Sequence, residues 1–182
     1  MTLSAIVLAA GEGTRMRSQR PKPRPKEFID GEEFLYLGRK YELSLVPRAT
    51  KDVELTDRLC LADRVRPFAS RALKRWYQVA ARQFIGQRCE WYAASIGCQP
   101  VSVKINDARK RWGSCGSKGT LNFSWRLIMA PPDIIDYVVV HELAHIGQLN
   151  HSAAFWRRVA DVLPDYKIRE AWLQENGGLL TL

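Results

Sequence analysis

His141-Glu142-Leu143-Ala144-His145 decides the fold, because it places two imidazoles one turn apart on the same helix. At 3.6 residues per turn, positions i and i+4 share a face and lie about 6 Å apart along the axis. Two such side chains can bind one metal ion, at nitrogen–metal distances of about 2.0–2.1 Å. Glu142 is turned aside from the pair, where a carboxylate can act as the general base on a metal-activated water. His151 is the natural third ligand, because Gly147 and Asn150 permit the intervening turn.

The distribution of histidines favours a metal site over a buried helix that carries two histidines by chance. The chain has three histidines, and all of them lie between positions 141 and 151. Three protein ligands leave the fourth tetrahedral position open, so the pattern predicts a catalytic Zn²⁺ site rather than a closed structural one. Pro131 and Pro132 suit a first helical turn, and Asp133 favours its positive end. The residues from Ile134 to Ala144 are apolar around most of the helix, so we expect it to be central and buried.

Length and composition are those of an ordinary globular protein. The 182 residues suit one domain, or one domain with an appendage, and no apolar run approaches the roughly 20 residues of a membrane span. We find no signal peptide. The four cysteines form no Cys-x-x-Cys pair, so we expect reduced thiols in a cytoplasmic protein.

The first 26 residues differ from the rest of the chain. They hold six basic residues against Glu12 alone, so +5 of the net charge of +9 lies there. Ser4 to Ala10 is typical of a short buried strand, a Gly11-Glu12-Gly13-Thr14 turn follows, and the basic, proline-punctuated stretch to Lys26 favours extended chain. A strand followed by such a loop is a plausible phosphate cradle.

This segment resembles the opening signature of sugar-nucleotide nucleotidyltransferases, in Leu8 to Met16 and in Pro21-Lys22-Pro23. That family needs a large α/β domain behind the signature, and nothing after Lys26 resembles one. We therefore interpret residues 1–26 as an N-terminal appendage with a truncated signature, and 27–182 as the functional domain.

Hydrophobic patterning predicts the remaining elements. We expect a hairpin over 34–45 with its turn at 38–40, a long helix over 67–95 that ends at Gly97, and a helix capped by Ser152 that runs to Val162. Alternation predicts strands over 101–105, 110–115 and 121–127, and a last helix is capped by Asp165 and closed by Gly177 and Gly178.

From about Glu27 to Leu180, and most densely over 109–176, the chain resembles the YgjP-like metallopeptidase family, zincins related to the SprT-like proteins. The likeness is carried by Arg111-Trp112-Gly113-Ser114-Cys115, 122–127, 130–132, 135–145, 150–152, Phe155-Trp156, 164–166 and Trp172-Leu173. The resemblance implies an α+β fold: a zincin-like helical core whose His-Glu-x-x-His helix packs on a small β-sheet. It also implies a zinc-dependent hydrolase with His141, His145 and His151 as ligands and Glu142 as the catalytic base.

Three further residues are candidates for substrate binding. Arg111 and Trp112 either form a cleft wall that fixes substrate or oxyanion, or serve as a salt bridge and a core anchor. Tyr166 either donates a hydrogen bond to a developing oxyanion or packs, and packing is the preferred interpretation.

The sequence is compatible with three alternative functions. The leading one is a zinc metallopeptidase with a peptide or protein substrate. The second uses the same metal to hydrolyse a phosphoanhydride such as a nucleoside triphosphate, with basic residues neutralising the phosphates. The third is a basic nucleic-acid-associated module with a structural metal, whose binding would depend steeply on salt. The sequence does not indicate an oligomeric state.

Overall fold

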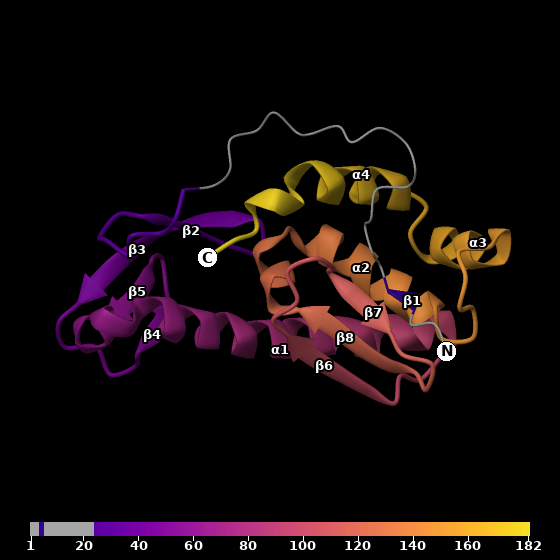
Figure 1. Ribbon diagram of the computed structural model, residues 1–182, viewed down its shortest axis with the longest axis horizontal. Helices are drawn as coiled ribbons and strands as arrows, with labels where there is room; N and C mark the ends of the chain where they lie inside the picture. Colours follow the sequence, from indigo (N-terminus) through magenta and orange to yellow (C-terminus); the bar gives the residue numbers. More distant parts are fainter. Residues whose placement is uncertain (1–3, 6–23) are drawn as a thin grey trace.

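The computed structural model describes residues 4–5 and 24–182 (Figure 1). In this part of the chain, four α-helices pack with two four-stranded sheets, which confirms the predicted α+β class. Most of the predicted strand over Ser4–Ala10, the Gly11–Thr14 turn and the stretch up to residue 23 lie outside the described residues. None of the helices formed by the described residues has the length and apolar composition that a bilayer-spanning segment needs.

The first sheet has the order β1-β7-β8-β6 and lies beside the central helix. Its strands are β1 (Ser4–Ala5), β6 (Ser102–Asn106), β7 (Gly113–Cys115) and β8 (Thr120–Ser124). β7 runs antiparallel to both neighbours, with Ser4 opposite Cys115, whereas β6 and β8 are parallel. β6 packs on α1 and β7 on α2, so the short strand β7 is the part of the sheet nearest to the His-Glu-x-x-His helix.

The second sheet has the order β2-β3-β5-β4 and lies at the other end of the molecule (Figure 1). It contains β2 (Glu33–Tyr36), β3 (Arg39–Val46), β4 (Val53–Leu55) and β5 (Leu59–Ala62). The predicted hairpin is present, but its turn falls at Leu37 and Gly38, with φ of 48° and 76°, and not at 38–40. Glycine is needed at 38 because an added Cβ would lie 2.9 Å from the Pro131 Cα, at the start of the central helix.

The long helix α1 (Ala69–Ile96) follows the short η1 (Asp63–Phe68) and connects the two sheets (Figure 1). Its buried residues recur every four positions, which gives one continuous apolar stripe: Ala69, Leu73, Tyr77, Ala81, Ile85, Cys89 and Ala93. The helix ends at Gly97, as predicted, in the left-handed conformation with φ of 69°. Trp76 contacts the hydrophobic clusters at both ends of the molecule, so α1 joins them into one body.

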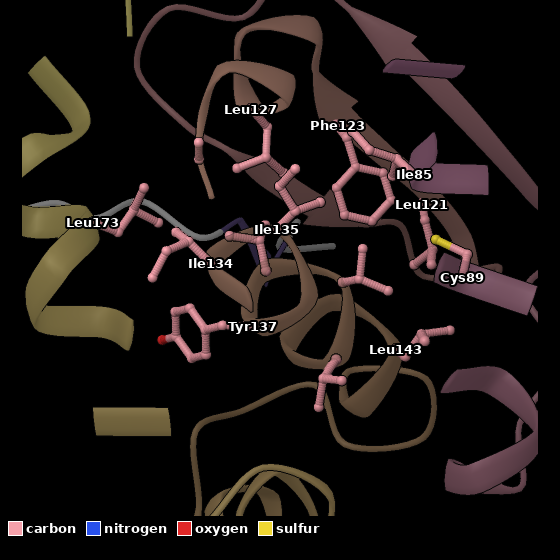
Figure 2. Close-up of a cluster of buried hydrophobic side chains, with 14 of the residues drawn as sticks. Ile85, Cys89, Leu121, Phe123, Leu127, Ile134, Ile135, Tyr137, Leu143 and Leu173 are labelled. Atoms are coloured by element: carbon pink, nitrogen blue, oxygen red, sulfur yellow. The ribbon is translucent and has the colours of Figure 1, made fainter. Parts of the chain in front are cut away.

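The central helix α2 (Pro132–Ala144) is buried from Ile134 to Ala144, as its composition predicted. Figure 2 shows Leu173 of α4 on one side of α2, and Cys89 of α1 with Leu121 and Phe123 of β8 on the other. Asp136 of α2 is paired with α1: Arg88 donates to both of its carboxylate oxygens, at 2.6 Å and 2.7 Å. This bidentate geometry fixes the rotation of α2 relative to α1.

Two predicted strands are shorter than expected. The strand predicted over 110–115 is confined to β7, and that predicted over 121–127 ends at Ser124, where η2 (Trp125–Met129) begins. Long-range contacts of Trp125 explain why the second strand ends early: its indole donates to Asp107 at 2.7 Å and stacks on Tyr77 at 5.8 Å. A tryptophan held in this way turns the chain out of the sheet.

The C-terminal helices are α3 (Ala153–Val162) and α4 (Tyr166–Asn176), followed by η3 (Gly177–Leu179). Ser152 caps α3 as predicted, accepting from the Phe155 N–H at 3.3 Å. Asp165 precedes α4 without a side-chain cap and pairs instead with Arg169 at 3.0 Å. Arg158 of α3 donates to the carbonyls of Ile96 and Ile146, which anchors α3 to the C-terminal ends of α1 and α2.

Candidate metal centre

The three histidines converge at the C-terminal end of α2. The Nε2 atom of His141 lies 3.2 Å from that of His145 and 3.0 Å from that of His151. His141 lies in the last turn of α2 and His145, one turn later, is its C-cap residue; His151 returns to them because Gly147, with φ of +94°, reverses the chain. The predicted turn is thus present, and the three ring nitrogens surround a single point.

Hydrogen bonding orients these nitrogens for ligation. His145 Nδ1 lies 2.9 Å from the carbonyl oxygen of Gln148, so Nδ1 carries the proton and donates it. The Nε2 atom of His145 therefore presents a lone pair to the other two rings, as a metal ligand must. His141 and His145 are buried, whereas His151 is exposed and is the ring nearest to solvent.

The environment keeps all three imidazoles uncharged. Burial lowers the pKa of His141 well below its ordinary value, and the neighbouring imidazoles lower it further. Burial also lowers the pKa of His145 and of His151. Because a metal ligand must be a neutral imidazole, the donor set fits a divalent cation. Three nitrogen donors from the protein are a ligand set that catalytic metal sites use.

Glu142 lies beside the histidines in a fully enclosed position. Its side chain is 0% exposed, and neither carboxylate oxygen has a hydrogen-bond partner among the described residues. Burial raises the pKa of Glu142 well above its usual range, and the nearby Arg111 guanidinium acts in the opposite direction. A buried carboxyl without a partner is costly unless it is neutral or faces a cation. This position also fits a cation held by the three imidazoles.

Gly113 makes room for the Glu142 carboxyl. A Cβ at position 113 would lie 2.7 Å from the Glu142 Cγ and 2.9 Å from its Cδ, and it would also overlap Oε1. The strand β7 can therefore pass over Glu142 only with glycine at this position. This role of Gly113 was not predicted from the sequence, although a glycine inside a short strand often marks a place where another part of the protein approaches the strand closely.

The three candidate substrate residues lie in different surroundings. Arg111 precedes β7, is partly exposed, and acts electrostatically on Glu142. Trp112 packs beneath the C-terminal segment, where a Cβ on Gly177 would meet its indole at 2.9 Å. Tyr166 begins α4 and stacks on Trp156 with centroids 5.1 Å apart. For Trp112 and Tyr166, these contacts favour the packing alternatives.

Two aromatic residues of α3 complete the site. The buried ring of Phe155 contacts all three imidazoles, with centroids 4.5–4.9 Å away. Trp156 stacks on His151 at 5.6 Å with an interplanar angle of 24°. The sequence indicated that both residues face inward, but it did not indicate that they contact the histidines.

An α+β fold with a buried His-Glu-x-x-His helix and a returning third histidine defines a zincin-like core. A family model described as "YgjP-like, metallopeptidase domain" matches residues 11–176, so the chain belongs to the YgjP-like metallopeptidase family. The match begins earlier than the likeness noted from position 27, and no comparison supports the nucleotidyltransferase likeness of the first residues.

Among solved structures, the chain is similar to the metallopeptidase zymogen of Pyrococcus abyssi abylysin. The two are 26% identical, the match covers 48% of this chain and 89% of that chain, and the TM-score is 0.44. No curated protein matches the sequence significantly.

Proposed function

We propose that this protein is a zinc-dependent peptidase in which His141, His145 and His151 hold the ion and Glu142 is the general base. One observation carries the proposal: three neutral imidazoles converge on one point beside a buried carboxyl that has no hydrogen-bond partner among the described residues. Membership of a metallopeptidase family supports the same reaction class.

When bound, zinc would supply Lewis-acid chemistry that polarises a peptide carbonyl and lowers the pKa of a water molecule. The protein's own part is to place Glu142 where it accepts the proton of the attacking water and returns it to the leaving amine. Gly113 and the fully buried surroundings hold that carboxyl in one orientation. Arg111, as the neighbouring cation, helps to keep the carboxylate ionised and able to accept the proton.

The proposal also covers the domain boundary, the roles of Trp112 and Tyr166, and the cellular compartment. Residues 27–182 form the peptidase domain and 1–26 an appendage to it. Trp112 supports the site as an anchor beneath the C-terminal segment, and Tyr166 contributes through packing. The four free cysteines are compatible with a reducing compartment, so we assign the protein to the cytoplasm.

A substrate screen on zinc-loaded protein tests the proposed function. Unstructured protein and a mixed peptide library are offered beside nucleoside triphosphates, and new amino termini and free phosphate are measured. Glu142→Gln is the control, because it keeps the shape of the side chain but removes the base. Peptide cleavage that disappears in this variant supports the proposal. Release of phosphate without peptide cleavage would replace it with the phosphoanhydride reaction.

A further inference from the structure

The third histidine differs from the other two in how it is held. His141 belongs to the buried helix α2 and His145 is its C-cap residue; both side chains are buried, and the Gln148 carbonyl orients the His145 ring. His151 lies outside any helix, between Gly147 and the cap residue Ser152, and is exposed. An exposed side chain on a connecting segment samples several rotamers unless contacts restrict it. Some other part of the structure must therefore fix the direction of its Nε2 atom.

A column of stacked rings supplies that restriction. The His151 imidazole stacks on the Trp156 indole with centroids 5.6 Å apart and an angle of 24°, and the same indole stacks on Tyr166, at 5.1 Å and 17°. Phe155 meets His151 edge-on at 4.8 Å and 82°, so a second surface blocks rotation out of the stack. His151 is thus confined between a face and an edge.

The column draws its rings from two separate helices. Trp156 is on α3, Tyr166 is the first residue of α4, and each is only partly buried. Trp156 also meets His141 at 5.7 Å and 76°, so the indole contacts both a helical ligand and the loop ligand. Phe155 also contacts both ligands, but Trp156 is the ring that lies face to face with His151.

We propose that Trp156, held by its stacking on Tyr166, is a positioning residue that keeps His151 in the orientation required for metal binding. This inference rests on the three-histidine site of the proposed function. Trp156 has no metal-ligating atom of its own. It acts by restricting the His151 side chain before the metal binds, so that less conformational entropy is lost on metal binding. Residues that orient a ligand typically change metal affinity by about 10- to 100-fold when they are removed.

Zinc affinity measured by competition with a chromogenic chelator tests the proposal on metal-free protein. Trp156→Leu should weaken zinc binding by about 10-fold or more, whereas Trp156→Phe, which keeps a ring face against His151, should stay within about threefold of the wild type. Trp91→Leu is the matched control, because Trp91 is 67% exposed on α1 and its ring contact among the described residues is with Arg88 and not with a histidine. Wild-type affinity in a folded Trp156→Leu protein would overturn the inference.

A second substitution and a spectroscopic measurement cover the case in which Trp156→Leu fails to fold. Tyr166→Leu removes only the outer ring of the column and should weaken zinc binding by about threefold, with Tyr166→Phe restoring it; equal affinities in all three proteins would overturn the inference. Co²⁺ held by the histidines should also quench the fluorescence of Trp156, whose ring centroid lies 5.6 Å from that of His151, so the quench should be smaller in Trp156→Phe than in the wild type. An equal quench would contradict the stacked placement.

His151→Ala separates this inference from the proposed function. If His151→Ala binds zinc as tightly as the wild type, the metal site itself is wrong. If His151→Ala loses zinc while the Trp156 and Tyr166 variants retain it, only the positioning role is wrong.

Discussion

Gly113→Ala provides a sharp test of the packing between β7 and the candidate catalytic carboxyl. The added Cβ would lie 2.7 Å from the Glu142 Cγ, where ordinary contacts are 3.4–4 Å, so strand and helix must separate or Glu142 must change rotamer. Overpacking of this kind costs about 1–3 kcal/mol in folding free energy. For a chain of this size that lowers the melting temperature by about 2–12 °C. Displacement of the base by about 1 Å should also reduce turnover on the order of 10²-fold.

Gly86→Ala is the matched control, because a Cβ at position 86 of α1 meets no atom within 4 Å. This substitution should stabilise the helix by about 0.4–1 kcal/mol and leave turnover unchanged. Both variants keep the three histidines, so their zinc content should equal that of the wild type. The assay is thermal unfolding of metal-free protein together with peptide hydrolysis of the loaded protein. Wild-type melting temperature and turnover in Gly113→Ala would refute the close contact on which the argument depends.

Three further predictions address the base, a surface ion pair and the N-terminal segment. Glu142→Gln should keep its fold and zinc but lose hydrolysis by about 10²- to 10⁴-fold, because an amide cannot accept the proton; near-normal turnover would exclude Glu142 as the base. Lys74, the first of several donors, holds the pKa of Asp107 well below its usual range, so this pair stabilises the fold above a pH of about 4 and loses its effect as the pH falls further. Urea unfolding of Asp107→Asn should therefore show a deficit at pH 7 that shrinks in acid, and a pH-independent deficit would contradict this cause. Deleting residues 1–26 should leave zinc content and hydrolysis intact and cost modest stability, since the described part of this segment contributes a two-residue pairing of β1 with β7 and an ion pair between Lys26 and Glu32; loss of zinc on deletion would show that the segment belongs to the domain.

Local signals in the sequence predicted most of the helical structure. Periodicity and end signals located α1 with its Gly97 terminus, α2 with its prolines, and the Ser152 cap of α3. These features depend on residues within one or two helical turns of each other, so the local sequence is sufficient to predict them.

Features that depend on distant residues were not predictable in this way. The shift of the chain from β8 into η2 follows from the Trp125 contacts with Asp107 and Tyr77, which lie 18 and 48 positions away. The parallel pairing of β3 with β5, and of β6 with β8, is likewise not encoded in alternation. Strand patterns state which face is buried but not which neighbour is chosen.

In the candidate site too, local features were predictable from the sequence and features that depend on distant residues were not. The spacing of the histidines predicted that they could share an ion, and their ring nitrogens do converge. The glycine that accommodates Glu142 and the indole that stacks on His151 were visible only in three dimensions, because β7 and α3 approach the end of α2 from different parts of the chain.

Elemental analysis of the metal content tests whether the three histidines form a zinc site. Wild-type protein purified without chelator and analysed for elements should contain one zinc per chain, and His141→Ala, His145→Ala and His151→Ala should each lose most of it while retaining the helical signal in circular dichroism. Each of these variants removes one of three nitrogens that meet within 4.8 Å, and two ligands hold zinc far more weakly than three. Stoichiometric metal retained in all three variants would contradict the account.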